Sequence, residues 1–323
     1  MKAIRYHRYG PPEVLELVDV DVPMIGDDEA LVRVRAASVN PLDYHFMRGT
    51  PYLVRMASGL RRPRDGVIGV DLAGEVEAVG KNVTAFAPGD AVFGSRDGAF
   101  AEYVRIRHDK VVLPKPGNLT MEQAAAVPVA GFSALQALRD KAKVQPGQKV
   151  LVNGAGGGVG TFAVQLAKAF GCEVTAVGST SKVELMRQLG ADRVVDYTRE
   201  DYTRGPARYD AIIDMAGSHT LSENRRALTP KGVYVGVGGP DGGKWVGPLI
   251  GALQPAVISP FVSQRLSVFL ARARRDDLAV LSRMLEAGQV TPVIDRTYPL
   301  AEAGEAIRYL EQGHAQGKVV LTI

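Results

Sequence analysis

Five glycines in one short stretch are the first residues whose spacing points to chemistry. The stretch reads NGAGGGVGTF and covers residues 153–162. Glycine inside regular structure costs about 0.5 to 1 kcal/mol relative to alanine, and a folded domain has only about 5 to 15 kcal/mol of net stability. A ligand that approaches the backbone, or an unusual turn, must compensate for this cluster.

The neighbours of these glycines favour a ligand, and in particular a dinucleotide. The preceding VLVNG is typical of a buried strand, and the following TFAVQLAKAFG has helical periodicity up to Gly171. A glycine-rich turn between a strand and a helix lets the backbone approach a diphosphate and leaves amides at the positive end of the helix. The residues expected to line the diphosphate are Ala155, Gly156, Gly157, Gly158, Val159 and Gly160. A turn whose glycines serve packing alone is the alternative.

The end of the next predicted strand indicates which dinucleotide binds. A P-loop is excluded, because Thr161 and Phe162 stand where that motif needs Lys and Ser or Thr. An NAD site places Asp or Glu about 20 residues after the loop, to hold the ribose hydroxyls. Here GSTSK offers the hydroxyls of Ser179 and Ser181 and the cation of Lys182, without a carboxylate. This composition favours a 2′-phosphate and hence NADP(H); a solvated helix start with Ser or Thr as N-cap is the alternative.

Composition limits the other function classes. The chain has 323 residues, 46% of them hydrophobic and 23% charged, as expected for a globular protein of one or two domains. A net charge of +4 without a nucleic-acid-reading motif argues against nucleic acid as a partner. The single cysteine, Cys172, excludes a disulfide framework within the chain and a multi-cysteine zinc site. Together with the absence of a signal-peptide core after Met1, it predicts a cytoplasmic protein.

One uncharged stretch runs between Lys244 and Arg265, long enough to cross a bilayer. Three prolines within it, Pro248, Pro255 and Pro260, argue against a membrane span. We therefore expect no stable membrane insertion, and interpret this stretch as a pocket wall or a subunit interface.

The elements that must position these residues follow from two periodicities. In the first third, ALVRVRAASV, GEVEAVG and AEYVRIR alternate as strands do, which indicates a β-rich, barrel-like domain. Helical spacing covers residues 124–138, and from VLVNG onward strands and helices alternate, which predicts an α/β fold with a parallel sheet covered on both faces. The tail is mixed, with helices expected at 276–288 and 301–312 and a final strand KVVLTI.

Several further motifs resemble the medium-chain dehydrogenase/reductase superfamily over the whole chain. They are SVNPLD (38–43), GVDLAGEVEAVG (69–80), PGDAVFG (88–94), AAAVPVAGFSALQAL (124–138), LGADRVVDY (189–197) and GKVVL (317–321). The resemblance implies a GroES-like domain at 1–126 and 268–323, with a doubly wound Rossmann domain inserted at 127–267. It also implies a homodimer, for which the apolar residues 245–270 are the expected interface.

The motif positions that hold catalytic zinc in alcohol-oxidising members carry other residues here. A Cys, a His-Glu pair and a second Cys are matched by Asn40, by Val70 with Asp71, and by Pro128. These residues do not supply a thiolate and an imidazole, so no metal is expected. The chain is thus similar to the zinc-free quinone oxidoreductase branch, which includes zeta-crystallin and the reticulon-interacting reductases.

The resemblance also assigns cofactor contacts beyond the glycine loop. In NADPH-dependent members, a Lys after the second Rossmann strand and a Tyr fifteen residues later hold the adenosine phosphate, and Lys182 and Tyr197 have that spacing. The other residues implied to line the cofactor are Ala216, Gly217, Gly236, Val237, Gly238 and Lys318.

Without zinc, the expected acceptors are compounds that take hydride readily, such as quinones and α,β-unsaturated carbonyls. The Asn40 amide is the expected donor to the acceptor oxygen, and Asp43 belongs to the same motif. Many members of the branch have Tyr five residues after the motif Asn; here His45 follows Tyr44, and either could donate a proton. The alternatives are an NAD(P)-dependent alcohol or carbonyl oxidoreductase and an NADPH-binding sensor with little turnover. The remaining histidines, His7, His108, His219 and His314, show no partner pattern.

Overall fold

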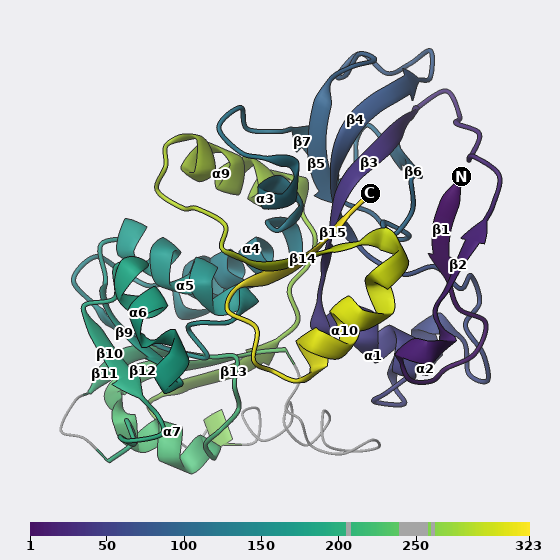
Figure 1. Cartoon of the computed structure of the whole chain (residues 1–323). Helices are drawn as coiled ribbons and strands as arrows, with labels where there is room; N and C mark the ends of the chain where they lie inside the picture. The colour runs from purple at the N-terminus through teal and green to yellow at the C-terminus, as the bar shows by residue number, and fades with distance from the viewer. Residues whose placement is uncertain (205–207, 239–257, 260–261) are drawn as a thin grey trace. The chain divides into compact units, whose positions relative to one another are not determined.

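The computed structural model describes residues 1–204, 208–238, 258–259 and 262–323 (Figure 1). These residues divide into two compact units. Unit 1 comprises Met1–Val129, Ala273–Gly288 and Pro292–Ile323, and unit 2 comprises Ala130–Arg272 and Gln289–Thr291. The apolar stretch expected as an interface lies outside the described residues at 245–257 and 260–261.

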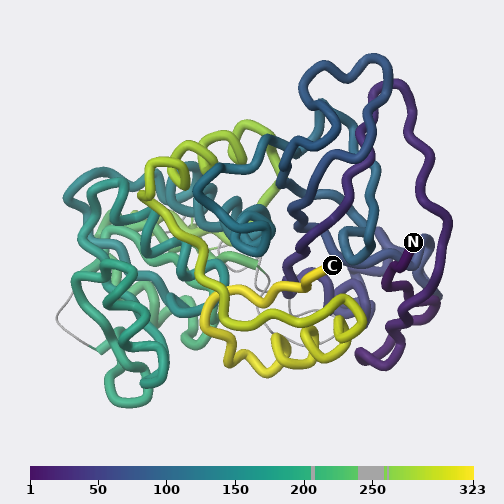
Figure 2. Tube along the Cα trace, turned by 45° about the horizontal axis from the view of Figure 1, so that its top comes forward, coloured from purple at the N-terminus to yellow at the C-terminus, as the bar shows by residue number. Residues whose placement is uncertain are grey.

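Unit 1 is built mainly on antiparallel strands, with β14 and β15 paired in parallel. Among its described residues, one sheet has the order β14–β15–β3–β4–β5–β7, with β6 also paired to β3, and β1 and β2 form a separate pair. The strands are β1 (Lys2–Arg5), β2 (Glu16–Asp19), β3 (Glu29–Val39), β4 (Asp71–Val79), β5 (Ala91–Ser95), β6 (Tyr103–Arg107), β7 (Val112–Pro114), β14 (Ile294–Pro299) and β15 (Lys318–Thr322). The C-terminal strand β15 lies beside β3, so the yellow end of the chain returns to the purple N-terminal part (Figure 2). The strands expected near 30–39, 74–80 and 101–107 are confirmed.

The helices of unit 1 include one that the alternating pattern of the first third did not predict. They are α1 (Pro41–Arg48), α2 (Val54–Ser58), α3 (Met121–Ala125), α9 (Arg275–Glu286) and α10 (Ala303–Glu311), with short turns η1 (Pro12–Val14) and η5 (Leu300–Glu302). Helix α1 begins where Asn40 caps it and Pro41 takes the first helical position, and it ends at Gly49, whose φ is +60°. The sequence NPLD is therefore a helix start.

Unit 2 contains a parallel sheet with the order β10–β9–β8–β11–β12–β13 among its described residues. Its strands are β8 (Lys149–Asn153), β9 (Glu173–Gly178), β10 (Arg193–Asp196), β11 (Tyr209–Asp214), β12 (Leu228–Val237) and β13 (Arg265–Phe269). The chain starts at β8, moves outward to β10, and then resumes at β11 on the other side of β8. The order therefore reverses between β8 and β11, and ligands bind at such a reversal, outside the carboxyl ends of the strands.

The helices of unit 2 cover both faces of this sheet. They are α5 (Gly158–Ala169), η3 (Thr180–Lys182), α6 (Val183–Gln188) and α7 (Leu221–Ala227), together with α4 (Pro128–Leu135), which enters from unit 1 and continues as a π-helix, η2 (Gln136–Ala142). Crossovers between parallel strands are almost always right-handed, so α5 and α6 lie on one face and α7 on the other. Helical spacing over 124–138 predicted a single helix; the structure interrupts it between Ala125 and Pro128, because proline lacks the amide and its ring clashes with the preceding turn. Among the described residues, no helix is both long and apolar enough to cross a bilayer.

Candidate functional site

The glycine loop connects β8 to α5 in unit 2, and two of its glycines are required by the fold itself. Gly154 has a φ of +86°, a conformation that L side chains rarely adopt. A Cβ on Gly160 would lie 2.1 Å from the Gly154 carbonyl oxygen and 2.6 Å from the Ala155 Cα. Gly160 therefore allows the start of the helix to pack directly on the turn, the role that the third glycine has in a dinucleotide fingerprint.

Gly157 differs from these two glycines, because no neighbour among the described residues requires a glycine there. It is the N-cap of α5, with φ −92° and ψ 178°, which any residue can adopt. A Cβ there would meet only the Gly154 carbonyl oxygen, at an ordinary distance of 3.5 Å. As a glycine, it brings no side chain to cap the first amides of the helix. The first backbone amides of α5 therefore receive no hydrogen bond from an N-cap side chain. This positive end of the helix can stabilise an anionic ligand.

The residues predicted to hold the adenosine phosphate lie at the carboxyl ends of β9 and β10. The Lys182 side chain crosses the glycine loop, since a Cβ on Gly156 would lie 2.6 Å from Lys182 Cδ. Ser179 Oγ and Ser181 Oγ are 3.1 Å apart. Tyr197 follows β10 with an exposed side chain, and its amide donates to the Gly178 carbonyl at the end of β9. The structure therefore gathers these four predicted residues around the ends of two adjacent strands.

A carboxylate at the end of β10 is close to this group. Asp196 Oδ2 accepts from the Thr180 hydroxyl at 2.6 Å, and Oδ1 accepts from the Thr198 hydroxyl at 2.8 Å. The bond from Thr180, followed by those from Thr198, lowers the pKa of Asp196 although burial opposes this. Arg199 Nε lies 3.6 Å from the same carboxylate and offsets part of its charge. Both oxygens of the Asp196 carboxylate therefore accept hydrogen bonds from protein groups.

The other predicted cofactor residues follow β11 and β12. The backbone amides of Ala216 and Gly217 donate to Asp214 Oδ1 at 3.1 and 2.9 Å, which fixes the turn after β11. Gly236 and Val237 end β12, and Gly238 follows with a φ of +87°. All of them lie at the edge of the sheet where the glycine loop lies.

In unit 1, two of the residues predicted to be catalytic, Asn40 and Asp43, belong to a buried polar cluster. Asn40 is 1% exposed and its side chain is fully engaged. Its Nδ2 donates to the Ser38 carbonyl at 3.2 Å and to Asp71 Oδ2 at 3.0 Å, and its Oδ1 accepts from Lys318 Nζ at 2.5 Å. Its backbone amide donates to Asp43 Oδ2 at 2.7 Å. Both hydrogens of the Asn40 amide therefore have protein acceptors.

Asp71 is the second centre of this cluster. It accepts from the Ser38 hydroxyl at 3.1 Å and from the backbone amide of Val129, and it lies 3.9 Å from Lys318 Nζ. Lys318, implied by resemblance to approach the cofactor, thus pairs with Asn40 and Asp71 within unit 1. Asp71 stands at one of the two positions where alcohol-oxidising members have a His-Glu pair, and no role was predicted for it from the sequence. Its place directly after the apolar run GVIGV was the available signal.

The charges of the cluster depend on burial. Burial raises the pKa of Asp43 to about 7, and the neighbouring Asp71 carboxylate adds to this while hydrogen bonds oppose it. Burial also raises the pKa of Asp71, against the effect of the Lys318 ammonium, and lowers the pKa of Lys318, against the effect of the two carboxylates. One cation thus faces two carboxyl groups, which favours keeping a proton on Asp43.

Two side chains on α1 are able to donate or accept a proton. His45 Nδ1 lies 2.9 Å from the Thr50 carbonyl oxygen. Because a carbonyl only accepts, Nδ1 carries the hydrogen, and Nε2 is the nitrogen that can exchange a proton. The rings of Tyr44 and His45 are in contact, with centroids 4.6 Å apart. Tyr44 and His45 both lie on α1, which has Asn40 as its N-cap and Asp43 in its first turn.

Fold and motifs now define the class of protein. Residues 26–117 match the alcohol dehydrogenase GroES-like domain, and residues 189–321 match the zinc-binding dehydrogenases. The chain belongs to the quinone oxidoreductase branch of the medium-chain dehydrogenase/reductase superfamily, which confirms the resemblance found in its motifs.

Individual relatives cover nearly the whole chain. It is 34% identical to the chloroplastic NADPH-dependent alkenal/one oxidoreductase of Arabidopsis thaliana, over 99% of this chain and 79% of the relative. It is 32% identical to the quinone oxidoreductase of Homo sapiens, over 100% of this chain and 98% of the relative. The structure of the quinone oxidoreductase from Coxiella burnetii superposes with a TM-score of 0.87, at 32% identity, covering 100% of this chain and 99% of that one.

Proposed function

We propose that this protein is an NADPH-dependent oxidoreductase that transfers hydride to a quinone or an α,β-unsaturated carbonyl. The observation that carries the proposal is Gly157, a glycine at the start of α5 that the fold itself does not need. Close approach of a diphosphate to the backbone supplies the reason for it. The names of the relatives, an NADPH-dependent alkenal/one oxidoreductase and a quinone oxidoreductase, support the same reaction.

The cofactor is NADP(H), held by residues of unit 2. The amides at the start of α5 bind its diphosphate, and Lys182, Ser179, Ser181 and Tyr197 surround its 2′-phosphate. The choice against NAD rests on the end of β9, where an NAD site requires a carboxylate and this chain has Gly178 followed by Ser179. The carboxylate of Asp196, at the end of β10, accepts hydrogen bonds from Thr180 and Thr198. When bound, the cofactor supplies the hydride.

Hydride transfer proceeds without a metal in this proposal, although the second matching family is named for zinc. At the former ligand positions, the Asp71 carboxylate accepts from Ser38, Asn40 and Val129 and faces a lysine ammonium. A buried ammonium 3.9 Å from the carboxylate opposes a second cation. Within the described ranges, no group of three or more His, Cys, Asp or Glu side chains is arranged to hold a metal ion.

The acceptor also needs one proton. Reduction of an enone adds hydride to the β-carbon and a proton to the α-carbon, and a quinone takes one hydride and one proton to become the hydroquinone. Asn40 has both amide hydrogens engaged, so we assign it to positioning α1 rather than to the acceptor oxygen. Tyr44 and His45 are the proposed donors, with His45 acting through Nε2.

The test is a turnover screen with the purified protein. Quinones, enones, aldehydes and alcohols are offered with NADPH or NADH, with and without a strong chelator. We expect NADPH oxidation with quinones or enones, much slower oxidation of NADH, and no effect of the chelator. Alcohol oxidation that the chelator abolishes would contradict the proposal. Tight NADPH binding with no turnover of any acceptor would favour the sensor alternative.

We also propose a cytoplasmic homodimer. β13 stands at the end of the strand order found among the described residues and is followed by Leu270, whose side chain is 76% exposed. An open strand edge with an apolar neighbour suits pairing across a two-fold axis. Sedimentation equilibrium and cell fractionation test assembly and location, and a monomer at micromolar concentration would contradict the dimer.

A further inference from the structure

Helix α2 in unit 1 carries apolar side chains on its exposed face. Leu53, Met56 and Ala57 have the spacing i, i+3, i+4, so they share one face of the helical turns, and all three are exposed. The Met56 side chain is 68% exposed. A helix at the surface of a globular protein normally turns its apolar face to the core. In α2 this arrangement is reversed.

The inward face of α2 is polar and is attached to the rest of unit 1. The Arg55 guanidinium contacts two aromatic rings, with its Cζ 4.6 Å from the ring centroids of both Tyr9 and Tyr52. The Tyr9 hydroxyl donates to the Gly59 carbonyl at 2.5 Å and lies 2.7 Å from Ser58 Oγ. These contacts fix the helix with its apolar face outward.

A tight loop follows α2 and adds another exposed apolar side chain. Gly59 ends the helix with a φ of +125°, and a Cβ there would lie 2.1 Å from the Arg62 carbonyl oxygen. The Arg64 amide donates to the Ser58 carbonyl at 2.9 Å, which closes the loop. The loop residues therefore stay beside the end of α2. Leu60, one of them, is 72% exposed.

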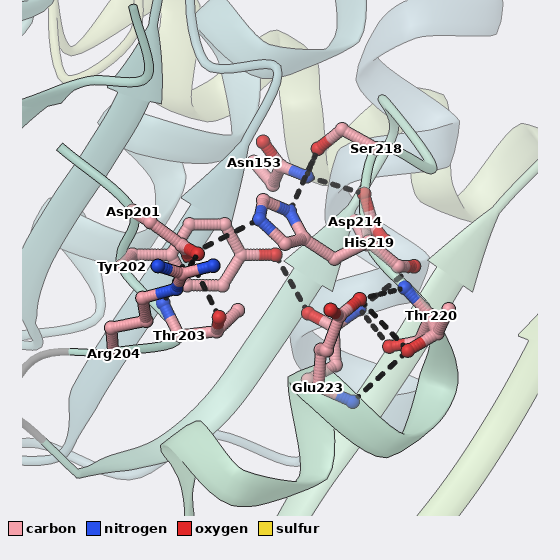
Figure 3. Close-up of polar contacts among 11 residues, drawn as sticks. Asn153, Asp201, Tyr202, Thr203, Arg204, Asp214, Ser218, His219, Thr220 and Glu223 are labelled. Carbon is pink, nitrogen blue, oxygen red and sulfur yellow. Dashed lines mark hydrogen bonds and ion pairs between the residues drawn. The ribbon is translucent and has the colours of Figure 1, made fainter. Parts of the chain in front are cut away.

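Several exposed arginines elsewhere in the chain face carboxylates, as Figure 3 shows for Arg204 in unit 2. Arg204 Nε lies 3.1 Å from Asp201 Oδ2. The other oxygen of Asp201 lies 3.2 Å from His219 Nε2. His219 Nδ1 lies 3.1 Å from Ser218 Oγ, which accepts from Asn153 Nδ2 at 3.1 Å. The charges of Arg204 and Asp201 are thus met by groups of the protein.

The arginines after α2 are not matched in this way. Helix α2 and its loop together contain four arginines and no acidic residue before Asp65. Arg61, Arg62 and Arg64 are exposed, and none of them forms an ion pair with another described residue. Arg62 and Arg64 line one surface hollow together with His7. Three unpaired cations thus lie beside exposed Leu and Met side chains.

We propose that these residues bind the surface of a lipid bilayer that carries anionic headgroups. Apolar side chains of a peripheral protein enter the boundary between headgroups and acyl chains, and arginines pair with the anionic headgroups. One short segment of unit 1 supplies both kinds of side chain. Binding of this kind is peripheral and requires no membrane-spanning helix. The residues that form this surface, called the α2 patch below, are Leu53, Met56, Leu60, Arg61, Arg62 and Arg64.

Two other occupants fit the α2 patch less well. A second copy of the chain bound across a two-fold axis would bring the same arginines face to face, and their charges would repel one another. An acidic protein segment would match the arginines but would leave the side chains of Met56 and Leu60 in water. The proposal depends neither on the cofactor nor on the reaction, so it goes beyond the proposed function.

The experiment measures binding of the whole protein to lipid vesicles by co-sedimentation. Vesicles of phosphatidylcholine alone are compared with vesicles that also contain phosphatidylglycerol. We expect the apparent Kd to be at least about tenfold lower for the anionic vesicles. Added salt screens surface charges, so this Kd should rise about tenfold between low and high salt.

Charge reversal tests the arginines of the α2 patch. The double variant with Arg61→Glu and Arg62→Glu should weaken binding to anionic vesicles about 10- to 100-fold. Its matched control is the double variant with Arg274→Glu and Arg283→Glu. These two arginines are exposed at α9 in the same unit, and their reversal changes the net charge equally. The control should weaken binding by less than about threefold.

Removal of an apolar side chain tests the other half of the α2 patch. Met56→Ser should raise the apparent Kd for anionic vesicles about three- to tenfold, and this effect should persist at high salt, since burial of apolar surface is not screened. Met24→Ser is the matched control, because Met24 is 87% exposed in the same unit but lies outside the patch. It should leave the Kd unchanged.

Equal binding to both kinds of vesicle would overturn the proposal, and so would equal effects of the patch variants and their controls. Melting temperatures identify a variant that has lost its fold. Arg61→Ala with Arg62→Ala then replaces the charge reversal, because it removes two cations without adding carboxylates. Vesicle binding is measured without NADPH, and turnover of a water-soluble quinone is measured separately. A protein that binds anionic vesicles but reduces no acceptor would therefore contradict only the proposed function.

Discussion

Lys318 Nζ donates a 2.5 Å hydrogen bond to Asn40 Oδ1, although 278 residues separate the two in the chain. The bond forms because β15 pairs with β3 in unit 1, with Val319 opposite Val39. It ties the start of α1, and hence Tyr44 and His45, to the C-terminal strand. Asp71, the first residue of β4, accepts a hydrogen bond from the same Asn40 side chain. The side-chain amide of Asn40, which follows β3, is therefore held by residues of the two strands that flank β3.

Removal of the Lys318 charge should destabilise unit 1 strongly. Lys318→Met leaves the buried Asp71 carboxylate without its cation, and we expect the free energy of unfolding to fall by about 3 to 5 kcal/mol. In the double variant with Asp71→Asn, no buried charge is left unpaired between the two positions, so its loss should be smaller than the sum of the single losses. Urea unfolding of the four proteins measures this coupling. Additive losses would show that the two charges do not interact.

Two glycines of the same loop should respond differently to alanine. Gly160→Ala forces a Cβ to within 2.1 Å of a carbonyl oxygen, and we expect it to cost about 1 to 3 kcal/mol of stability. Gly157→Ala meets nothing closer than 3.5 Å, so stability should change by less than about 1 kcal/mol while NADPH binding weakens at least about tenfold. Thermal melts and NADPH titrations separate the two effects. Normal NADPH affinity in Gly157→Ala would remove the main support for the proposed function.

Lys182 should distinguish the two nicotinamide cofactors. Lys182→Ala removes a cation from the proposed 2′-phosphate site, and we expect the NADPH Kd to rise about 10- to 100-fold. NADH lacks that phosphate, so its Kd should hardly change. Arg187→Ala is the matched control, because Arg187 lies in α6 and pairs with Glu184 at 3.6 Å on the exposed face. Equal effects of Lys182→Ala on both cofactors would place the 2′-phosphate elsewhere.

Asp43 should make stability depend on pH. Its pKa is about 7 in the folded protein and 3.8 without the fold, so the folded state binds the proton more tightly. The stabilisation is complete below the lower value and is lost as pH rises through the higher one. Between about pH 5 and pH 8, the wild type should lose about 2 kcal/mol of unfolding free energy relative to Asp43→Asn, as measured in urea at each pH. Parallel pH profiles of the two proteins would show that Asp43 is already ionised.

His45 should affect turnover without affecting cofactor affinity. If Nε2 delivers the proton, His45→Phe should lower kcat by about 100-fold or more, with the NADPH Kd unchanged. Tyr44→Phe removes only a hydroxyl from the neighbouring ring and identifies the donor by comparison. A kcat close to wild type in both variants would indicate that water protonates the product.

Much of unit 2 could be predicted from local pattern alone. The strands of a parallel sheet are buried on both faces, so VLVN and VTAVG appear as short apolar runs, and the glycines between β8 and α5 mark a turn that few other residues can form. Helix α1 escaped prediction, since its signal is a cap and a proline rather than a periodic apolar face. The residues of NPLD were noticed for their motif, and their role as a helix start was visible only in the backbone.

The sequence by itself determined the class of fold, the glycine loop between a strand and a helix, and the lack of thiolate and imidazole ligands at the positions that hold zinc in alcohol-oxidising members, because these depend on residue types at short spacing. Tertiary structure decided which partners the polar side chains have. Asp71 and Lys318 come from different strands and Asn40 from the start of a helix, and Ser218 and His219 find Asn153 and Asp201 only where strand ends converge. A hydrogen bond acts over about 3 Å, so its partners depend on how distant segments fold together.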